Sequence, residues 1–277
     1  MTINCKGNLI DLFNPKVMGI LNVTPDSFFD GGRYKNTTSI INQVTEMITD
    51  GATFIDLGAY SSRPGADYVS EEEELKRVIP IVNLLINEFP EILISIDTFR
   101  SKVAEEAIYN GVAIINDISA GNLDLKMLDV IAKHQVPYIM MHMKGTPQTM
   151  QQHTDYKDLL TDILYYFSEK IADSHSKGIH DIIIDPGFGF AKTLEQNYEL
   201  MQKLELFKTI KAPLLVGISR KSMIYKLLQT DAKNALNGTT ILNTISLLKG
   251  ANILRVHDVK EAFECVQLTK QLKAENS

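Results

Sequence analysis

Residues 92–117 read ILISIDTFRSKVAEEAIYNGVAIIND, a complete strand–helix–strand unit. Two apolar runs, Ile92–Ile96 and Val112–Ile115, flank a helical segment that stops at Gly111, where a left-handed cap is favourable. The runs do not alternate with polar residues, so they predict strands that are buried on both faces of a parallel sheet. This unit therefore predicts an α/β protein.

The same pattern recurs along the whole chain. Further apolar runs of strand length occur at Val17–Leu21, Thr53–Ile55, Val136–Met141, Ile182–Ile184, Leu214–Ile218 and Ile253–Val256. Helical patterns separate them, and one opens with the capping sequence Ser70-x-x-Glu73. Eight strands that alternate with helices predict a single-domain (β/α)8 TIM barrel over residues 1–277, with a short N-terminal extension at 1–15. A doubly wound open sheet is the alternative, although no GxGxxG follows the first strand.

Composition narrows the class of function. The 277 residues carry 28 Lys and Arg against 34 Asp and Glu, a net charge of −6 that disfavours nucleic acid and anionic membranes as partners. The N-terminus does not have the pattern of a signal peptide, and no apolar run reaches the roughly 18 residues of a membrane span. Cys5 and Cys265 have no CxxC spacing and are expected to be free thiols. We therefore expect a cytoplasmic protein.

Each predicted strand ends in a polar residue, and in a barrel the residues that follow the strands form the site of catalysis. They are Asn22, Asp56, Asp97, Asn116 with Asp117, His142, Asp185, Ser219–Lys221 and His257 with Asp258. Loops are polar in any protein, so one such residue carries little weight. Polar groups at all eight ends, with the cations Arg63, Lys221 and Arg255 nearby, predict a site for a flat ligand with a donor-rich edge and a phosphorylated tail.

Two carboxylates are the strongest candidates for binding such an edge. Asp97 and Asp185 follow apolar runs and need hydrogen-bond donors if they are partly buried. The paired N–H groups of a pterin or guanine ring would supply them, and loop amides are the alternative. Asn116 either contacts the same ring or ties a loop together. Lys221 is either a ligand donor or a surface lysine at a helix start.

The last strand indicates a phosphate site. Arg255 and His257 alternate in RVHDV, so their side chains point the same way, beside the N-terminus of the final helix. An ion-paired arginine and a core histidine are the alternatives.

Two segments, 22–36 and 59–68, combine turn residues with Phe28 and Arg63, as expected of mobile lids or of ordinary surface turns. Motifs of zinc proteases, P-loops and serine hydrolases do not occur.

Eight segments, in order, resemble the signature blocks of the dihydropteroate synthase family. They are MGILNVTPDSFFDGG (18–32), IDLGAYSSRPGA (55–66), SIDTFRSKVAEEAI (95–108), NDISAG (116–121), MMHMKGTPQTMQ (140–151), DPGFGFAKTLEQNYELM (185–201), VGISRKSMI (216–224) and LRVHDV (254–259). The resemblance implies a homodimeric (β/α)8 transferase of folate biosynthesis. This enzyme would condense 6-hydroxymethyl-7,8-dihydropterin pyrophosphate with p-aminobenzoate, with Mg²⁺, and sulfonamides would compete with p-aminobenzoate.

Carried over by position, the resemblance also implies roles for individual residues. The pterin would be bound by Asp97, Asn116, Ile118, Met141, Asp185, Phe190, Gly217 and Lys221. p-Aminobenzoate would be surrounded by Phe28, Ser62, Arg63, Pro64, Phe190, Lys221 and Ser222. Pyrophosphate would be held by Asn22, Arg63, Arg255 and His257, with Asn22 also near Mg²⁺. Asp97, Lys221, Arg255 and His257 would be catalytic: pyrophosphate would leave first, and the arylamine would then attack a pterin methylene cation.

One loop departs from the family pattern. The family usually reads GGESTRPG, whereas this chain has GAYSSRPG at 58–65, with Ala59, Tyr60 and Ser62 as the differences. These changes concern the lid and the p-aminobenzoate pocket rather than the pterin site. A pterin-dependent methyltransferase on the related barrel, or a non-catalytic pterin-binding protein, are the competing functions.

Overall fold

The computed structural model describes residues 1–22, 33–58 and 69–274, with the backbone alone for 33–36, 273 and 274. Within these residues eight strands form one sheet in the order β8-β7-β6-β5-β4-β3-β10-β9. They are β3 (Lys16–Asn22), β4 (Phe54–Gly58), β5 (Leu93–Asp97), β6 (Ile114–Asp117), β7 (Tyr138–Met141), β8 (Ile182–Asp185), β9 (Leu215–Val216) and β10 (Ile253–Val256). A parallel bridge between Ile184 and Leu214 joins the two edges, so the sheet closes. The (β/α)8 prediction is confirmed, and the open-sheet alternative is wrong.

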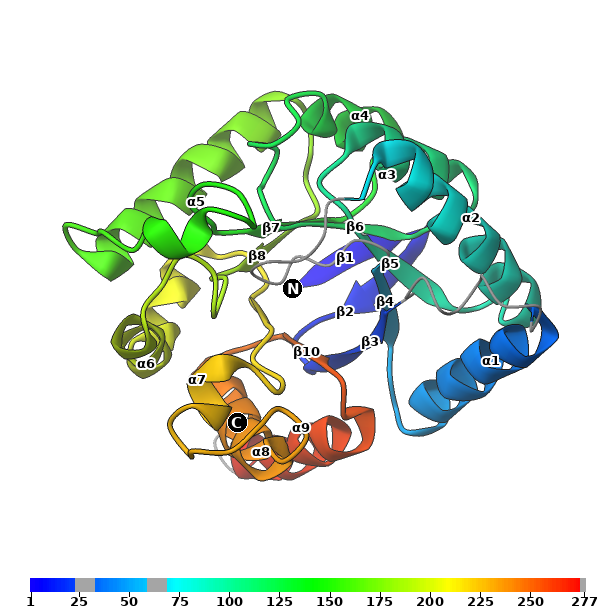
Figure 1. Cartoon of the computed structure of the whole chain (residues 1–277). Coiled ribbons are helices and arrows are strands. Elements are labelled where there is room, and N and C mark those ends of the chain that lie inside the picture. Colours follow the sequence, from blue (N-terminus) through cyan, green and yellow to red (C-terminus); the bar gives the residue numbers. More distant parts are fainter. Residues whose placement is uncertain (23–32, 59–68, 275–277) are drawn as a thin grey trace.

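Helices follow the strands and surround the barrel (Figure 1). They are α1 (Arg33–Thr49), α2 (Glu71–Glu88), α3 (Ser101–Tyr109), α4 (Met127–His134), α5 (Leu159–Ser176), α6 (Leu194–Gln202), α7 (Ser222–Tyr225), α8 (Leu236–Lys249) and α9 (Val259–Ala274), with the 3₁₀ helices η2 (Met150–Gln152) and η3 (Leu204–Ile210). The predicted cap of α2 is present, because Ser70 Oγ accepts from the Glu73 N–H at 3.2 Å. The helix end predicted at Gly111 is also confirmed, with a φ of 98°. Gly250, with a φ of 110°, caps α8 in the same way.

Alternation along the strands divides the apolar residues between two cores. Ile55, Leu57, Ile94 and Ile96 belong to the core between the barrel and its helices, together with apolar residues of α2. The residues between them in sequence point to the barrel interior, because successive strand side chains face opposite sides. Near the amino ends of the strands these inward residues are apolar: Met18, Phe54, Ile114, Ile139, Ile183, Leu215 and Ile253. The barrel interior is therefore packed, not hollow, at that end.

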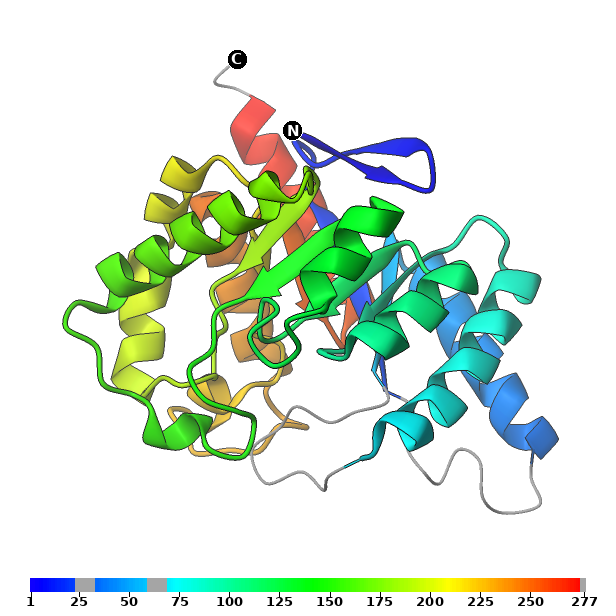
Figure 2. The same ribbon diagram turned by 90° about the horizontal axis from the view of Figure 1, so that it is seen from above.

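A hairpin within the predicted N-terminal extension closes the amino end of the barrel. Strands β1 (Thr2–Cys5) and β2 (Asn8–Asp11) pair antiparallel around a turn at Lys6 and Gly7, both with positive φ. Ile3, Cys5 and Leu12 are buried against the interior apolar residues. Figure 2 places this hairpin opposite the carboxyl ends of the strands. Both cysteines are buried and, as predicted, free, and burial raises the pKa of the Cys5 thiol to about 12.

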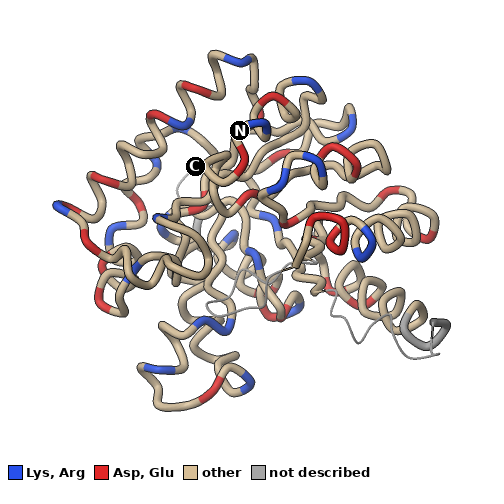
Figure 3. Tube along the Cα trace, turned by 45° about the horizontal axis from the view of Figure 1, so that its top comes forward, with Lys and Arg blue, Asp and Glu red and all other residues tan. Residues whose placement is uncertain are grey.

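The outer surface mixes charges of both signs. Lys and Arg are interspersed with Asp and Glu along the helices (Figure 3). Ion pairs such as Lys133–Glu105 at 2.6 Å connect neighbouring helices, although exposed pairs of this kind contribute at most about 1 kcal/mol each. In the described part of the chain, no helix combines the length and the apolar character that crossing a bilayer requires.

Candidate active site

The predicted site residues gather at the carboxyl ends of the strands. Asn22, Gly58, Asp97 and Asn116 are consecutive partners across β3, β4, β5 and β6. On the other side Met141 pairs with Asp185 across β7 and β8. A Cβ added to Gly217 would lie 3.8 Å from Arg255 Cβ and 3.9 Å from Asp185 Oδ2, so these three residues are also neighbours. Residues from seven strands thus meet at one mouth.

Arg255 lies between two carboxylates in this mouth. Its Nε donates to Asp56 Oδ2 at 2.6 Å and its Nη2 to Asp97 Oδ2 at 2.9 Å. Asn116 Nδ2 donates to the same Asp56 oxygen at 3.1 Å. Burial works against the charge of Arg255, but Asp56 and Asp97 outweigh it and raise its pKa. Burial raises the pKa of Asp97 to about 7, although Arg255 opposes that shift.

Asp56 is more deeply placed than the sequence indicated. The apolar run predicted a strand that ends at Ile55, whereas β4 continues to Gly58 and Asp56 pairs with Ser95 inside the barrel. The assignment of Asp56 to a strand end is therefore wrong. Its side chain is fully buried, and within the described structure its Oδ1 has no hydrogen-bond partner. The ion pair with Arg255 is what makes a charged residue tolerable in the middle of this strand.

Asp185 and Lys221 form the second charged group of the mouth. Asp185 Oδ1 accepts from the Gly187 N–H at 2.8 Å, and this is the one hydrogen bond of its side chain among the described residues. Lys221 Nζ donates to Phe188 O at 2.5 Å and lies 4.8 Å from the centre of the Phe190 ring. Burial raises the pKa of Asp185 and lowers that of Lys221 to about 8. A loop amide thus uses only one carboxylate oxygen, and Oδ2 is left for a ligand.

Apolar side chains form one wall beside these charges. Ile118 and Met141, both predicted as ring contacts, belong to a small buried cluster with Met143, Met150 and Ala191. Phe190 packs against it. The cluster is separate from the two cores of the barrel and lies on the connections after β6, β7 and β8. Apolar side chains next to hydrogen-bonding groups suit an aromatic ring as ligand.

His257 is held at the end of β10 by a serine that the sequence analysis did not assign a role. Ser219 Oγ accepts from the backbone N–H of His257 at 3.1 Å and lies 3.1 Å from its Nδ1. Next to this contact, Arg220 makes two hydrogen bonds to Asp258, at 2.9 and 2.7 Å. α9 begins directly afterwards, at Val259. His257 therefore lies beside the N-terminus of a long helix, as the phosphate prediction requires.

Part of the predicted site lies outside the described residues. Phe28, Ser62, Arg63 and Pro64 fall in 23–32 and 59–68, as do the family departures at Ala59 and Tyr60. Of the remaining predictions, Asn22 is exposed at the end of β3 and Ser222 is half-buried at the start of α7. The structure thus brings together the residues predicted to bind the pterin and the phosphates. Of the residues predicted to surround p-aminobenzoate, it describes Phe190, Lys221 and Ser222.

The residues near Asn22 fit a metal that is bound mainly by a ligand. Mg²⁺ in phosphate sites takes one or two protein oxygens and several phosphate oxygens. The amide of Asn22 offers one oxygen, whereas Asp56 and Asp97 are bonded to Arg255. Over residues 1–22, 33–58 and 69–274, no cluster of His, Cys, Asp and Glu could hold a metal alone. A pyrophosphate-borne Mg²⁺ is the form that this donor set suits.

Two buried residues of the mouth were missed as contributors. His142, predicted only as a polar strand end, turns its Nδ1 to Lys192 at 3.1 Å and packs edge-on against Tyr166. Lys192 lies in a segment that resembles the family but was given no role, and it is 3% exposed. Alternation along β4 could have indicated that Asp56 faces the same side of the strand as Phe54, toward the barrel interior. Nothing in the local sequence distinguishes Lys192 from a surface lysine.

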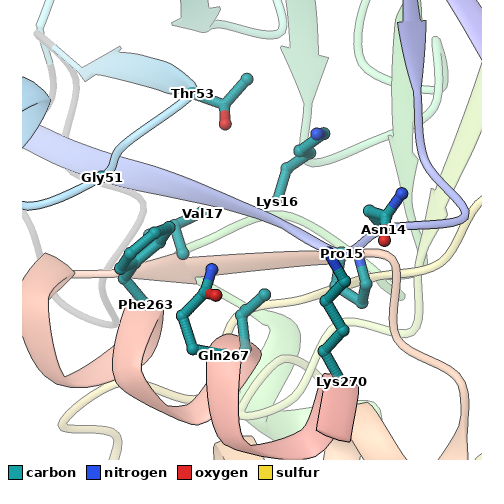
Figure 4. Close-up of a pocket in the computed structure, with 10 residues that line it drawn as sticks. Asn14, Pro15, Lys16, Val17, Gly51, Thr53, Phe263, Gln267 and Lys270 are labelled. Atoms are coloured by element: carbon teal, nitrogen blue, oxygen red, sulfur yellow. The ribbon is translucent and has the colours of Figure 1, made fainter. Parts of the chain in front are cut away.

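A cavity also exists at the other end of the barrel. It measures about 290 Å³ and is lined by Lys16 and Val17 at the start of β3, and by Phe263, Gln267 and Lys270 of α9 (Figure 4). None of the predicted site residues within the described ranges lines it. In barrels of this class the catalytic groups lie at the carboxyl ends of the strands, so we assign the site to the mouth and not to this cavity.

Known proteins resemble this chain over nearly its whole length. Residues 18–257 match the family model described as "Pterin binding enzyme". The chain is 43% identical to the dihydropteroate synthase of Escherichia coli K12 over 272 residues, which is 98% of this chain and 96% of the relative. It is 47% identical to the dihydropteroate synthase of Synechocystis over 259 residues, 92% of this chain and 89% of the relative.

Among solved structures, the Yersinia pestis dihydropteroate synthase with a sulfonamide drug complex superposes with a TM-score of 0.92 at 41% identity. The superposition covers 99% of this chain and 100% of that one. Fold, chain length and sequence therefore agree over nearly the whole molecule.

Proposed function

Because this chain belongs to the pterin binding enzymes, and within them to the dihydropteroate synthases, we propose that its barrel mouth holds the pterin ring, the pyrophosphate and p-aminobenzoate in three adjoining places. The enzyme is a transferase of folate biosynthesis that joins 6-hydroxymethyl-7,8-dihydropterin pyrophosphate to p-aminobenzoate, and it is a sulfonamide target. The observation that carries the placement is that one mouth combines three features: the Asp185 carboxylate, of which only Oδ1 is hydrogen-bonded among the described residues, the neighbouring cation Arg255, and His257 beside the N-terminus of α9.

The pterin would lie between Asp185 and the apolar wall. Asp185 Oδ2 would accept from the N–H edge of the ring, and Asn116 and Asp97 would face its opposite side. Lys221 would donate to a ring acceptor, and Ile118, Met141 and Phe190 would cover the ring face. Gly217 would leave room for the ring, because a side chain there would approach Asp185 and Arg255. Support comes from the burial of these groups around one opening.

p-Aminobenzoate would bind nearer to solvent. Phe190, Lys221 and Ser222 are described on that side of the mouth. Phe28, Ser62, Arg63 and Pro64 would complete the pocket from the two segments that lie outside the described residues. A sulfonamide would occupy the same place, in competition with p-aminobenzoate.

The enzyme would catalyse the reaction by stabilising the pyrophosphate as it leaves. Arg255, His257 and the N-terminus of α9 would face the charge that develops as the C–O bond to pyrophosphate breaks, with Asn22 and Arg63 at the outer side. When bound, Mg²⁺ would neutralise part of that charge, and Asn22 would be its protein ligand. Asp97, as an anion close to the ring, would favour the cationic pterin methylene that the arylamine then attacks. The nitrogen forms the new C–N bond and afterwards loses its proton.

The reaction itself is the test of this assignment. The purified enzyme is expected to form 7,8-dihydropteroate, with one pyrophosphate released per product over many turnovers, only when p-aminobenzoate and Mg²⁺ are both present. A reaction without p-aminobenzoate is the control. A non-catalytic pterin-binding protein would bind the pterin without release, and a methyltransferase would require a methylated folate and show no dependence on p-aminobenzoate.

We also propose a homodimer in which a second copy covers the face formed by α8 and α9. Five large apolar side chains on these two helices are 37–71% exposed: Ile241, Leu248, Phe263, Leu268 and Leu272. Adjacent exposed apolar residues on neighbouring helices are typical of a subunit interface.

The two free, buried cysteines support a reducing compartment, and we place the enzyme in the cytoplasm.

The dimer proposal can be tested by changing the charge of that face. Leu268→Glu together with Leu272→Glu is expected to convert the enzyme to a monomer in sedimentation velocity at micromolar concentration, because burying two carboxylates costs several kcal/mol. Leu125→Glu is the matched control, since Leu125 is 85% exposed on the connection before α4. A wild-type monomer, or a double variant that still sediments as a dimer, would contradict the assigned interface.

A further inference from the structure

Lys192 is a buried cation that the proposed chemistry does not use. It lies on the connection between β8 and α6 and is 3% exposed. Its Nζ donates to Gly187 O at 3.0 Å and to Phe190 O at 3.0 Å, and His142 Nδ1 lies 3.1 Å away. An ammonium group has three donors and no acceptor, so three acceptors satisfy it completely. A lysine buried this deeply is rare unless it is paired in such a way.

The two carbonyls belong to the turn that carries site residues. Phe190 N–H donates to Gly187 O at 3.1 Å, and Gly187 N–H donates to Asp185 Oδ1 at 2.8 Å. Gly187 has a φ of +71°, and a Cβ there would lie 2.2 Å from His142 O. The connection after β8 therefore packs directly on the connection after β7. Lys192 joins both connections, through two carbonyls of one and the imidazole of the other.

The charge of Lys192 also reaches the carboxylate that we assign to the pterin. Burial raises the pKa of Asp185, and Lys221, Arg255 and Lys192 oppose this shift. Burial lowers the pKa of Lys192 to about 7, with Asp185 opposing and Lys221 and Lys144 adding to the shift. Burial, with Lys192 and Lys144, lowers the pKa of His142 well below its usual range, so its Nδ1 is available as an acceptor. These are the titratable groups that face Lys192.

We propose that Lys192 is a positioning residue for the pterin site: it fixes the Gly187–Phe190 turn on His142 and thereby sets the orientation of Asp185 and of the Phe190 ring. The proposal rests on the proposed function for the identity of the ligand, but not for the role of the lysine in the turn. Without the ammonium, Phe190 O and His142 Nδ1 lose their donor and Gly187 O keeps only the Phe190 N–H, so the turn has to move to find other donors.

The test compares Lys192→Met with Lys144→Met. Lys144 is the matched control, because it is a nearby lysine whose Nζ donates to Asp155 O at 2.6 Å and lies 3.6 Å from the centre of the Tyr156 ring. Among the described residues it makes no hydrogen bond to the Gly187–Phe190 turn. Calorimetry with a pterin lacking phosphates is expected to show at least a tenfold weaker affinity for Lys192→Met, and a change of less than twofold for Lys144→Met.

A pH series separates positioning from general loss of structure. Asp185 has to be ionised to accept from the ring, so pterin affinity falls as the pH drops through its pKa. Loss of a neighbouring cation raises that pKa further, and the acidic loss of affinity in Lys192→Met should begin at a higher pH than in the wild type. The proposal would be overturned if Lys192→Met lost pterin affinity at the same acidic pH as the wild type, or if its pterin affinity were within twofold of the wild type.

Hydrogen exchange keeps the test independent of the ligand. Amides of 187–191 should exchange faster in Lys192→Met than in the wild type and in Lys144→Met, whether or not pterin binds. If the wild type bound no pterin, the proposed function would fail, while unchanged exchange in 187–191 would reject the role of Lys192. If Lys192→Met does not fold, Lys192→Gln, which keeps two N–H donors on a shorter side chain without the charge, is measured in the same way with the same criteria.

Discussion

Turnover by the Arg255→Ala enzyme is expected to be about 10²- to 10³-fold slower than wild type, the usual effect of removing one donor that stabilises developing negative charge. Affinity for a pterin without phosphates should fall much less, because the lost contact strengthens only as pyrophosphate departs. Steady-state kcat and calorimetry measure the two quantities. An equal loss in both would mean that Arg255 belongs to the ring pocket and not to the pyrophosphate site.

This substitution also disturbs folding, and a second variant separates the two effects. Arg255 bonds both Asp56 and Asp97, so its removal leaves two buried carboxylates without their cation. Breaking a buried pair in this way typically costs about 3–5 kcal/mol of unfolding free energy. Arg255→Met combined with Asp56→Asn removes the fully buried charge as well and should recover part of that stability in urea unfolding, while kcat stays low. Recovered turnover would show that the loss came from folding.

Asp185→Asn is expected to weaken pterin binding by on the order of 1–3 kcal/mol, or roughly 5- to 150-fold in Kd. In the carboxylate both oxygens are acceptors, Oδ1 for the Gly187 N–H and Oδ2 for the N–H edge of the ring. The amide offers one acceptor and one donor, so one of these two contacts is lost. Calorimetry with the pterin measures the loss. Unchanged affinity would remove Asp185 from the site.

The free energy of unfolding of Asp185→Asn should stay the same or rise while its pterin affinity falls. A loss of affinity caused by misfolding would instead come with lower stability. Burial raises the pKa of Asp185 above its unfolded value. A group shifted in this direction stabilises the fold at low pH, and that contribution is lost as the pH rises through its folded pKa. At neutral pH the ionised carboxylate therefore costs folding free energy, and the Asp185→Asn variant should unfold at the same or a higher urea concentration than the wild type.

The fold was predictable where burial on both faces leaves a clear mark in the sequence. Continuous runs such as Ile92–Ile96 are almost wholly apolar up to the strand end, and they became strands. β4 was predicted too short, because a carboxylate at Asp56 is unfavourable in a strand until Arg255, 199 residues later in the chain, is placed beside it. The β1–β2 hairpin was missed since its signal is weak: Ile3 and Cys5 alternate with polar residues over only four positions.

The site was predictable where the alternation of side chains along a strand determines which face of the sheet a residue lies on. Arg255 and His257 are two residues apart, so they had to share a face. The partners of these residues were not predictable, since the contact of Arg255 with both Asp56 and Asp97 depends on which strands become neighbours. Lys192 shows the same limit: its three acceptors come from two connections, and they meet only after the barrel has closed.

The β1–β2 hairpin limits the routes by which substrates can enter the barrel and products can leave it. With Ile3, Cys5 and Leu12 packed against the interior residues, the amino end of the barrel offers no passage through the described part of the chain. Both substrates and both products must therefore share the opening at the carboxyl ends. In the proposed arrangement p-aminobenzoate lies nearer to solvent than the pterin, so the pterin pyrophosphate would enter first, and pyrophosphate would leave along the path by which the next substrate arrives. Accumulated pyrophosphate should accordingly inhibit in competition with the pterin substrate, which places its rapid removal by hydrolysis among the conditions for sustained turnover.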